Sequence, residues 1–388
     1  MTHPAVSLLA DLIRRPSVTP KEEGVLDVLE AFLTPLGFTC TRLPFEGDGS
    51  YPVDNLYATR TGGRPGPHLL FAGHTDVVPP GDSAAWTHDP FSATIIDGVM
   101  WGRGATDMKS GVAAFCGAMA DLAERGGLDA GTVSLAITND EEADAINGTK
   151  KILEWADAQG EKFDFAIVGE PSSFEEFGDS IKIGRRGSVS GRITVTGKQG
   201  HSAYPERANN PLPILVEVAR ALSAPLDDGT EHFQATNLEV TSIDTGNPTA
   251  NVIPEKASLR FNVRFNDTWT GETLLAEIHR RIAAVDANGC TIGFEQIGPV
   301  SRCFISPPAG HVEHLTDVME EFNGVRPKLS TVGGTSDARF IAQYCPVVEC
   351  GLIGATMHQV DERVPVADVE RLARFYALYT EAFLSRGG

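Results

Sequence analysis

The stretch His68-Leu-Leu-Phe-Ala-Gly-His74-Thr-Asp76 joins an apolar run to two polar side chains at its end. A short apolar run of this kind predicts a buried strand, and α/β proteins place their chemistry where such strands end. The same pattern recurs in Val133–Glu142, which ends in two adjacent glutamates, and in Phe165–Glu170. These runs predict a sheet whose strand ends carry carboxylate and imidazole groups.

The order of elements around these runs predicts an α/β fold. Apolar residues at helical spacing indicate a helix over Pro4–Arg15, and the capping signal Thr19-Pro20-Lys21-Glu22 predicts a second helix that ends near Gly37. A further helix is expected from Gly111 to about Arg125. Strand-like runs lie near residues 54–59, 68–72, 131–138 and 163–169. Strands that alternate with helices indicate a mostly parallel sheet.

The pattern changes after Arg186 and the α/β pattern returns beyond Cys303. The elements between them follow the order β-α-β-β-α-β, which is the ferredoxin-like split unit. A chain of 388 residues also exceeds what one hydrophobic core usually serves. We therefore expect a catalytic domain made of residues 1–186 and 302–388, interrupted by an inserted α+β domain over residues 187–301.

Composition excludes several classes of partner. The formal net charge of −20 argues against nucleic acid, because no basic stripe is present. The six cysteines form no Cys-x-x-Cys pair, which is typical of reduced thiols in the cytosol. Asp11 interrupts the first apolar run, so no signal peptide is expected, and no stretch approaches the roughly 18 uncharged residues of a membrane span. We expect a soluble cytoplasmic protein without a membrane partner.

Imidazole and carboxylate groups at the strand ends point to a divalent metal. His74 and Asp76, two residues apart on a strand, face the same way, so Asp76 can accept a hydrogen bond from the ring nitrogen that does not bind metal. Taken alone, this pair also fits a surface contact, and Glu141-Glu142 also fits a solvated turn. Together they suit zinc or a similar ion better than calcium. A purely structural zinc fits poorly, since the set contains no cysteine.

The whole chain resembles the M20 peptidase-like family, the metallo-aminoacylase and carboxypeptidase group of co-catalytic zinc hydrolases. The motifs that carry this resemblance, in the family's order, are Gly73–Pro79, Trp101–Gly111, Asp140–Glu142, Val168–Pro171, Gly184–Ser188, Gly200–Pro205, Gly333–Arg339 and Met357–Glu362. The resemblance implies a zinc-peptidase-like catalytic domain with a mostly parallel sheet. It also implies that the inserted domain serves as a lid and for dimerisation, so a homodimer is expected.

The resemblance also implies two zinc ions per subunit, with cobalt possible at one site. The implied metal ligands are His74, Asp107, Glu142, Glu170 and His358. Asp107 would bridge the ions, with His74 and Glu170 on one and Glu142 and His358 on the other. In the family, the peptide that follows the bridging aspartate is often cis, which here is Asp107–Met108.

Three further side chains have implied catalytic roles. Glu141 would act as general acid and base, and Asp76 would orient His74. His201 would reach the active site of the partner subunit and stabilise the oxyanion. A hydrogen bond within its own loop is the alternative for His201.

Substrate-side residues implied by the resemblance are Arg185, Ser188, Tyr204, Asn251, Arg264 and Thr335. The arginines suit carboxylate recognition, although a surface ion pair would also explain each of them. Gly354 departs from an asparagine found in some members. Lys109 and Lys182 are expected to be exposed charges.

The implied activity is metal-dependent hydrolysis of a linear amide. The motifs favour release of succinate from N-succinyl-LL-2,6-diaminopimelate, in the synthesis of lysine and of peptidoglycan precursors. Deacetylation of acetylornithine, or hydrolysis of another N-acyl amino acid, is the alternative within the family. A metal-free binding protein is the alternative from another class, but neither a ligand nor Glu141 is missing.

Overall fold

The computed structural model describes residues 2–387, and the chain divides into two compact units. Unit 1 contains the residues up to Ile183, Ser306–Ser330, and those from Ser336 onward, whereas unit 2 contains Gly184–Ile305 and Thr331–Thr335. The catalytic domain expected from the sequence included residues 331–335. They group with unit 2 because their partners lie there: Thr331 donates a hydrogen bond to the carbonyl oxygen of His232, and Arg185 donates one to that of Val332.

Unit 1 is built on a mixed eight-stranded sheet in the order β1-β2-β6-β3-β7-β18-β8-β17. Its strands are β1 (Thr39–Gly47), β2 (Ser50–Thr61), β3 (Arg64–His74), β6 (Ala130–Thr138), β7 (Phe165–Val168), β8 (Ser180–Lys182), β17 (Lys328–Ser330) and β18 (Val347–Glu349). The centre, β6-β3-β7-β18, is parallel, and β1 and β2 add antiparallel strands at one edge. The expected α/β class is confirmed.

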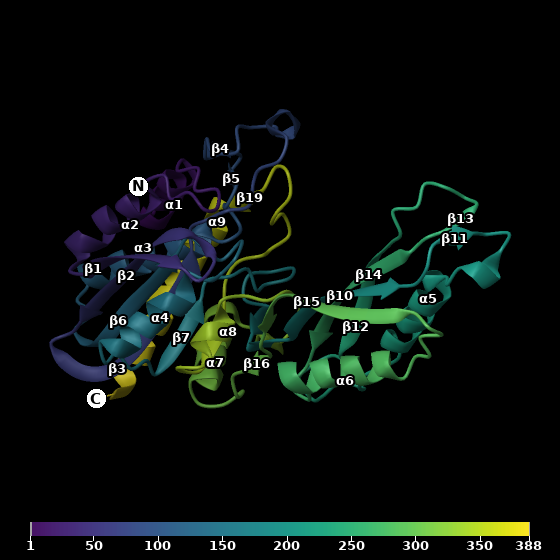
Figure 1. Cartoon of the computed structure of the whole chain (residues 1–388). Helices are drawn as coiled ribbons and strands as arrows, with labels where there is room; N and C mark the ends of the chain where they lie inside the picture. The colour runs from purple at the N-terminus through teal and green to yellow at the C-terminus, as the bar shows by residue number, and fades with distance from the viewer. Residues whose placement is uncertain (1, 388) are drawn as a thin grey trace. The chain divides into compact units, whose positions relative to one another are not determined.

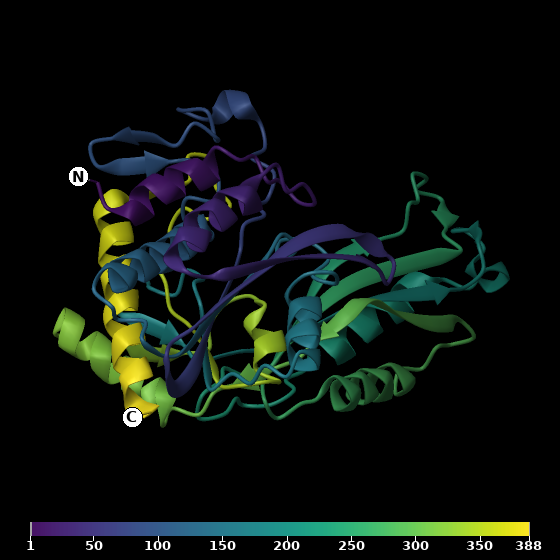
Figure 2. The ribbon, with the colours of Figure 1, turned by 90° about the vertical axis from the view of Figure 1, so that its left-hand side faces the viewer.

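Central strands are buried on both faces, which explains their continuous apolar runs. Every residue of β7 is buried, and so is β3 from His68 to His74. The helices of unit 1 are α1 (Pro4–Ile13), α2 (Val25–Leu33), α3 (Lys109–Glu124), α4 (Thr149–Ala158), α7 (His311–Asn323), α8 (Ala338–Ile341) and α9 (Val366–Leu384). Helices α3 and α9 pack against each other and on β3, while α4 packs on β6 (Figure 1). Figure 2 shows the long helix α9 with α7 beside it.

The predicted start of the second helix is wrong. Helix α2 begins at Val25, and the residues before it form a turn with a cis Thr19–Pro20 peptide bond. The Thr19 hydroxyl donates to Asp76 and does not cap a helix. Glu22 instead accepts hydrogen bonds from the backbone of Gly24 and Leu26, at 2.8 and 2.6 Å, so it caps a helix that starts later than the local pattern suggests.

Unit 2 contains a four-stranded antiparallel sheet in the order β12-β14-β10-β15. The strands of this sheet and the two α-helices that pack on it are, in chain order, β10 (Gly187–Thr196), α5 (Pro211–Leu222), β12 (Asn237–Asp244), β14 (Lys256–Phe265), α6 (Gly271–Ala283) and β15 (Thr291–Ser301). This is the β-α-β-β-α-β order of the ferredoxin-like unit. Buried and half-exposed residues alternate along β10, so one sheet face packs in a core with α5 and α6.

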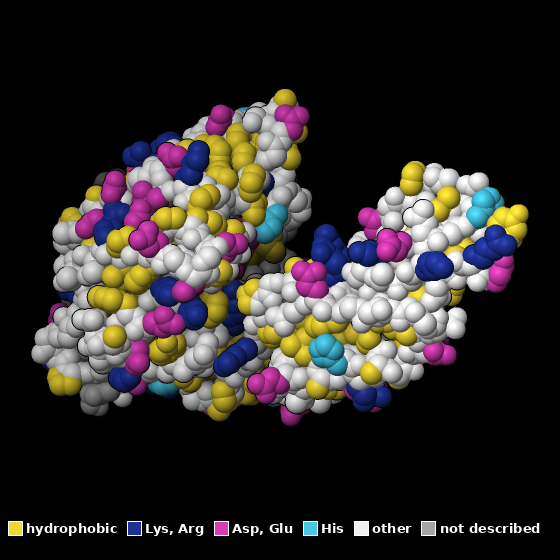
Figure 3. Space-filling view, viewed as in Figure 1, with side chains coloured by type: hydrophobic (Ala, Val, Ile, Leu, Met, Phe, Trp, Pro, Cys, Tyr) yellow, Lys and Arg dark blue, Asp and Glu magenta, His cyan; other side chains and the backbone are white. Residues whose placement is uncertain are grey.

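No helix within residues 2–387 has both the length and the apolar character needed to cross a membrane. All six cysteines are unpaired. On the face drawn in Figure 3, acidic and basic side chains are interspersed, with hydrophobic side chains in small groups between them.

Candidate metal centre

Three neighbouring parallel strands end at one edge of the unit 1 sheet. Strand β3 ends at His74, which lies opposite Thr138 at the end of β6, and β7 ends two residues before Glu170. Because parallel strands present their carboxyl ends at the same edge, residues far apart in sequence meet there. Glu141 and Glu142 lie in the loop that follows β6.

Two groups of candidate ligands converge at this edge. In the first group, His74 Nε2 lies 3.3 Å from Asp107 Oδ1 and 3.5 Å from Glu170 Oε1. In the second group, His358 Nε2 lies 3.3 Å from Asp107 Oδ2 and 3.1 Å from Glu142 Oε1. The potential ligand atoms of each group lie within 4.8 Å of one another. The two oxygens of Asp107 therefore face different histidines, as a carboxylate that bridges two cations would.

The donor atoms of the first group fit a bound cation. His74 Nε2 and Asp107 Oδ1 are both buried and have no hydrogen-bond partner among the described residues. Unpaired buried polar atoms are unfavourable, and a cation between them would satisfy both. The other ring nitrogen of His74 lies 2.9 Å from the backbone oxygen of Asp76, which directs Nε2 toward Asp107.

The close packing of acids and imidazoles shifts their pKa values. Burial lowers the pKa of His74, but the carboxylates of Asp107 and Glu170 outweigh it, and the pKa lies well above its usual range. Burial and the charge of Asp107 raise the pKa of Glu170 to about 7. Hydrogen bonding to Asp107 is the main reason that the pKa of His358 rises to about 10. Without a cation, this cluster therefore retains protons at neutral pH, which metal binding would release.

Glu141 lies beside the two groups without belonging to either. Its Oε2 is 4.0 Å from His74 Nε2, and burial, followed by the charge of Glu170, raises the pKa of Glu141 well above its usual range. A carboxyl group with a raised pKa next to metal ligands is suited to accept and return a proton.

Asp76 has a different set of contacts from the one expected. Its carboxylate lies 3.5 Å from His74 Nδ1, so the backbone oxygen at 2.9 Å is the nearer acceptor for that ring nitrogen. The carboxylate instead accepts hydrogen bonds from the backbone N–H groups of Glu141 and Glu142, at 3.3 and 3.1 Å. It also accepts one from the Thr19 hydroxyl at 2.7 Å. Asp76 thus holds the peptides that carry both glutamates.

The expectation that Lys109 and Lys182 are exposed charges is wrong. Lys109 is fully buried, and its ammonium group donates to the backbone oxygens of Leu12 and Arg15, both at 2.8 Å. Burial lowers the pKa of Lys109 to about 7. Lys182 is also buried and donates to the backbone oxygen of Pro171. The one available signal of this burial was the position of Lys109 at the start of an apolar helix.

The Asp107–Met108 peptide bond is cis, as the family resemblance implied.

Comparison with known proteins now identifies the family. A model of the peptidase family M20/M25/M40 matches residues 70–382. The chain belongs to this family. A curated relative from Methylorubrum populi, a succinyl-diaminopimelate desuccinylase, is 52% identical over 98% of this chain and 98% of its own.

Solved structures of the M20 family share the fold of nearly the whole chain. An M20 family metallo-carboxypeptidase from Sulfolobus solfataricus has a TM-score of 0.79 at 16% identity, covering 98% of this chain and 99% of its own. The Bacillus subtilis YXEP protein, described as a dinuclear metal-binding peptidase of the M20 family, has a TM-score of 0.70 at 16% identity. It covers 98% of both chains.

The remaining predicted site residues of this M20 chain belong to unit 2. They are Arg185, Ser188, His201, Tyr204, Asn251, Arg264 and Thr335. The exposed His201 accepts a hydrogen bond at Nδ1 from the backbone of Ala203, at 3.0 Å, and its ring centre lies 5.7 Å from that of Tyr204. The loop contact considered for His201 is therefore present, and it uses only one ring nitrogen.

Arg185, Ser188 and Arg264 lie in strands of unit 2, as His201 does. Ser188 and Arg264 stand opposite each other on β10 and β14, and burial lowers the pKa of Arg264. Arg185 is buried and contacts the segment 331–335, which ends at Thr335. The backbone oxygen of Asn251 accepts a hydrogen bond from the backbone N–H of Ser202, the residue after His201, at 3.0 Å.

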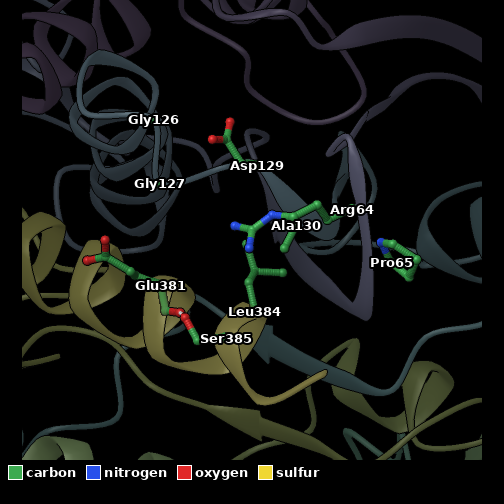
Figure 4. A pocket seen from close by; sticks show the side chains of 9 residues that line it. All are labelled: Arg64, Pro65, Gly126, Gly127, Asp129, Ala130, Glu381, Leu384 and Ser385. Atoms are coloured by element: carbon green, nitrogen blue, oxygen red, sulfur yellow. Dashed lines mark hydrogen bonds between the residues drawn. The ribbon is translucent and has the colours of Figure 1, made fainter. Parts of the chain in front are cut away.

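A pocket of about 500 Å³ lies elsewhere on unit 1 (Figure 4). It is lined by Arg64, Pro65, Gly126, Gly127, Asp129, Ala130, Glu381, Leu384 and Ser385. Strands β3 and β6 begin here, at Arg64 and Ala130, so the pocket lies at the opposite ends of these strands from the metal ligands. In open α/β sheets, ligands bind at the carboxyl ends, which favours the ligand cluster as the functional site.

Proposed function

We propose that this M20 chain is a succinyl-diaminopimelate desuccinylase. It would hydrolyse the amide bond of N-succinyl-LL-2,6-diaminopimelate with water, giving succinate and LL-2,6-diaminopimelate for lysine and peptidoglycan precursor synthesis. The likeness to the Methylorubrum populi relative, 52% identical across 98% of both chains, supports the choice of substrate. The same relationship favours this activity over acetylornithine deacetylation.

The observation that carries the chemistry is the position of Asp107, each of whose oxygens lies 3.3 Å from a different histidine. We assign the two ligand groups to two zinc ions per subunit, with cobalt as an alternative at one of them. Such ions polarise a carbonyl group and lower the pKa of water. The chain's own contribution is to hold three ligand carboxylates and two imidazoles at one sheet edge.

Glu141 is proposed as the general acid and base. It would take a proton from the attacking water and return it to the leaving amine. Its position outside both ligand groups, 4.0 Å from His74 Nε2, supports a role in proton transfer rather than in metal binding. The contact between Asp76 and the Glu141 backbone would keep the carboxyl group in place.

Unit 2 is proposed as the lid and dimerisation domain of a homodimer. Arg185 and Arg264 would recognise substrate carboxylates, since a guanidinium group binds a carboxylate through two hydrogen bonds. Ser188, Tyr204, Asn251 and Thr335 are proposed as further substrate contacts. His201 would stabilise the oxyanion in the partner subunit's site.

The substrate assignment is tested by turnover on N-succinyl-LL-diaminopimelate and N-acetylornithine side by side, with and without a chelator. We expect succinate release that is abolished by chelation and no turnover of acetylornithine. The opposite preference would overturn the substrate, and turnover that survives complete metal removal would overturn the mechanism.

The general-base assignment is tested by Glu141→Ala, which should retain metal and lose nearly all turnover. Glu154→Ala is the matched control, because Glu154 lies on α4 and belongs to neither ligand group; its carboxylate lies 3.7 Å from Lys150. Wild-type turnover in Glu141→Ala would sink the assignment.

Sharing of the site between subunits is tested by mixing two variants. His201→Ala should keep its metal and lose turnover. Heterodimers of His201→Ala and Glu141→Ala should recover part of the activity, since one of their two sites would have both residues. Heterodimers shown to form but still inactive would argue against a shared site.

A further inference from the structure

A buried carboxylate lies next to the metal centre without being one of its ligands. Glu362 has no exposed surface, and it follows His358 by four residues. Its Oε1 accepts hydrogen bonds from the backbone N–H groups of Thr106 and Asp107, at 2.8 and 3.1 Å. Its Oε2 accepts one from the backbone of Gly104 at 3.0 Å and pairs with Arg103 at 2.8 Å. The four donors come from one short segment, residues 103–107.

These bonds join the segment that carries Asp107 to the segment that carries His358. Asp107 is held through its own backbone N–H. Arg103 reinforces the connection, because it also donates to the backbone oxygen of Gln359, the residue after His358, at 3.2 Å. Glu362 and Arg103 therefore fix both segments relative to each other through charge-assisted bonds in a buried site.

The His358 segment needs such support because its backbone is strained. His358 and Asp361 both have φ near +61°, a conformation that residues other than glycine rarely adopt. Conformations of this kind persist only when surrounding contacts impose them. At Asp361 the contact is with Thr87, whose backbone N–H and hydroxyl both donate to the Asp361 carboxylate at 2.8 Å. At the next residue, Glu362, the contacts are the hydrogen bonds that its carboxylate accepts from residues 103–107.

We propose that Glu362 is a positioning residue that sets the spacing of Asp107 and His358, and thereby the affinity of the metal position that they share with Glu142. His74 and Glu170 depend less on Glu362, because strands β3 and β7 position them. The proposal rests on the metal-binding part of the proposed function. It does not depend on which amide is the substrate.

A purely structural role would predict a different result, so a matched control is needed. Asp227 in unit 2 also accepts several hydrogen bonds, from the backbone of Gly229 and Thr236 and from the side chains of Asn266 and Trp269. Asp227→Asn should lower stability without touching the metal centre. Glu362→Gln keeps the shape of the side chain and replaces one acceptor oxygen with a donor.

The experiment titrates metal-free full-length protein with cobalt(II). It follows the visible absorption of the bound ion, with chelator competition to obtain the two affinities and thermal unfolding of the metal-free forms. We expect two equivalents in the wild type. In Glu362→Gln one equivalent should weaken by about 10–100-fold with an altered absorption spectrum, and the other should change less. Asp227→Asn should unfold at a lower temperature and bind both equivalents normally.

Three results would overturn the proposal. The first is a Glu362→Gln protein that unfolds earlier but binds both equivalents with wild-type affinity and spectrum. The second is equal weakening of both equivalents. The third is a wild-type protein that binds no cobalt, which would also refute the proposed metal centre. The titration uses no substrate, so a wrong substrate assignment cannot produce any of these results. Glu362→Asp keeps the charge and should show a smaller loss at the same equivalent, which preserves the test if Glu362→Gln does not fold.

Discussion

Gly351 lies where the chain passes close to the backbone of the candidate metal ligand Glu170. A Cβ atom at this position would lie 2.5 Å from the carbonyl oxygen of Glu170 and 2.7 Å from that of Gly169. A carbon and an oxygen in ordinary contact are about 3.3 Å apart, so Gly351→Ala requires a shift of about 0.8 Å. Both neighbouring atoms are backbone atoms, so the shift cannot be absorbed by rotating a side chain.

The displacement should reach the metal centre because it acts on Glu170 itself. Overpacking in a buried site typically costs about 1–3 kcal/mol of stability. A misplacement of about 1 Å in a catalytic site can reduce the rate about 100-fold. We therefore expect Gly351→Ala to lose stability, to bind metal more weakly at the position shared by His74 and Glu170, and to turn over about 100-fold more slowly.

Two other glycines of unit 1 serve as controls. Gly117→Ala would place its Cβ atom 2.7 Å from the Cβ atom of Ala5 on α1, a similar overlap that involves no candidate ligand. It should lower stability and leave metal affinity unchanged. Gly63→Ala meets nothing within 4 Å and should change neither property.

The assay combines urea unfolding of the metal-free proteins, metal affinity by chelator competition, and steady-state kinetics of the loaded proteins. If Gly351→Ala lost stability like Gly117→Ala but kept wild-type metal affinity and turnover, the reasoning would be refuted. The close approach of Gly351 would then be a packing contact without influence on the Glu170 side chain.

Three further predictions follow from other contacts. Asp76→Asn puts an amide donor against the backbone N–H of Glu141 or Glu142, so one charge-assisted hydrogen bond of about 1.5–3 kcal/mol is lost. We expect kcat to fall about 10–100-fold, measured together with the metal content of the variant. A wild-type kcat would contradict this prediction. Burial lowers the pKa of His68 to about 4, so between pH 4 and the unfolded value near 6.5 only the unfolded state takes up the proton, and stability falls as the pH falls. The free energy of unfolding, measured with urea, should fall between pH 7.5 and pH 5 in both metal-free proteins, and the fall should be about 2 kcal/mol smaller in His68→Asn than in the wild type. Equal falls in the two proteins would contradict the assignment. Removing metal with a chelator should lower the unfolding temperature at neutral pH, as measured by calorimetry. Metal affinity should weaken as the pH falls, because the ligands must release protons to bind metal. Metal titrations at two pH values that gave the same affinity would contradict this prediction.

Local sequence patterns predicted the parts of the structure that depend on local order. The apolar runs at β3, β6 and β7 were recognisable because both faces of these strands are buried, and their ends located His74 and Glu170. Parallel pairing then brought those ends together.

Features set by distant partners were not predictable in this way. Helix α2 starts late because Glu22 caps it, whereas Thr19 bonds to Asp76, which is far away in the sequence. The burial of Lys109 depends on backbone oxygens at the end of α1, which no pattern around Lys109 indicates. The cis Asp107–Met108 bond was expected only from the family resemblance.

The order of strands in the unit 1 sheet has a consequence for how the protein is made. Strand β18 pairs with β7 at the centre of the sheet, yet it is synthesised after the segment Gly184–Ile305 of unit 2. A chain that is still emerging from the ribosome therefore has His74, Asp107 and Glu170 but lacks both β18 and His358. Its sheet is incomplete, and its second ligand group has no imidazole. The second ligand group is thus complete only once the chain includes His358, and a truncated product would carry the first ligand group without the second.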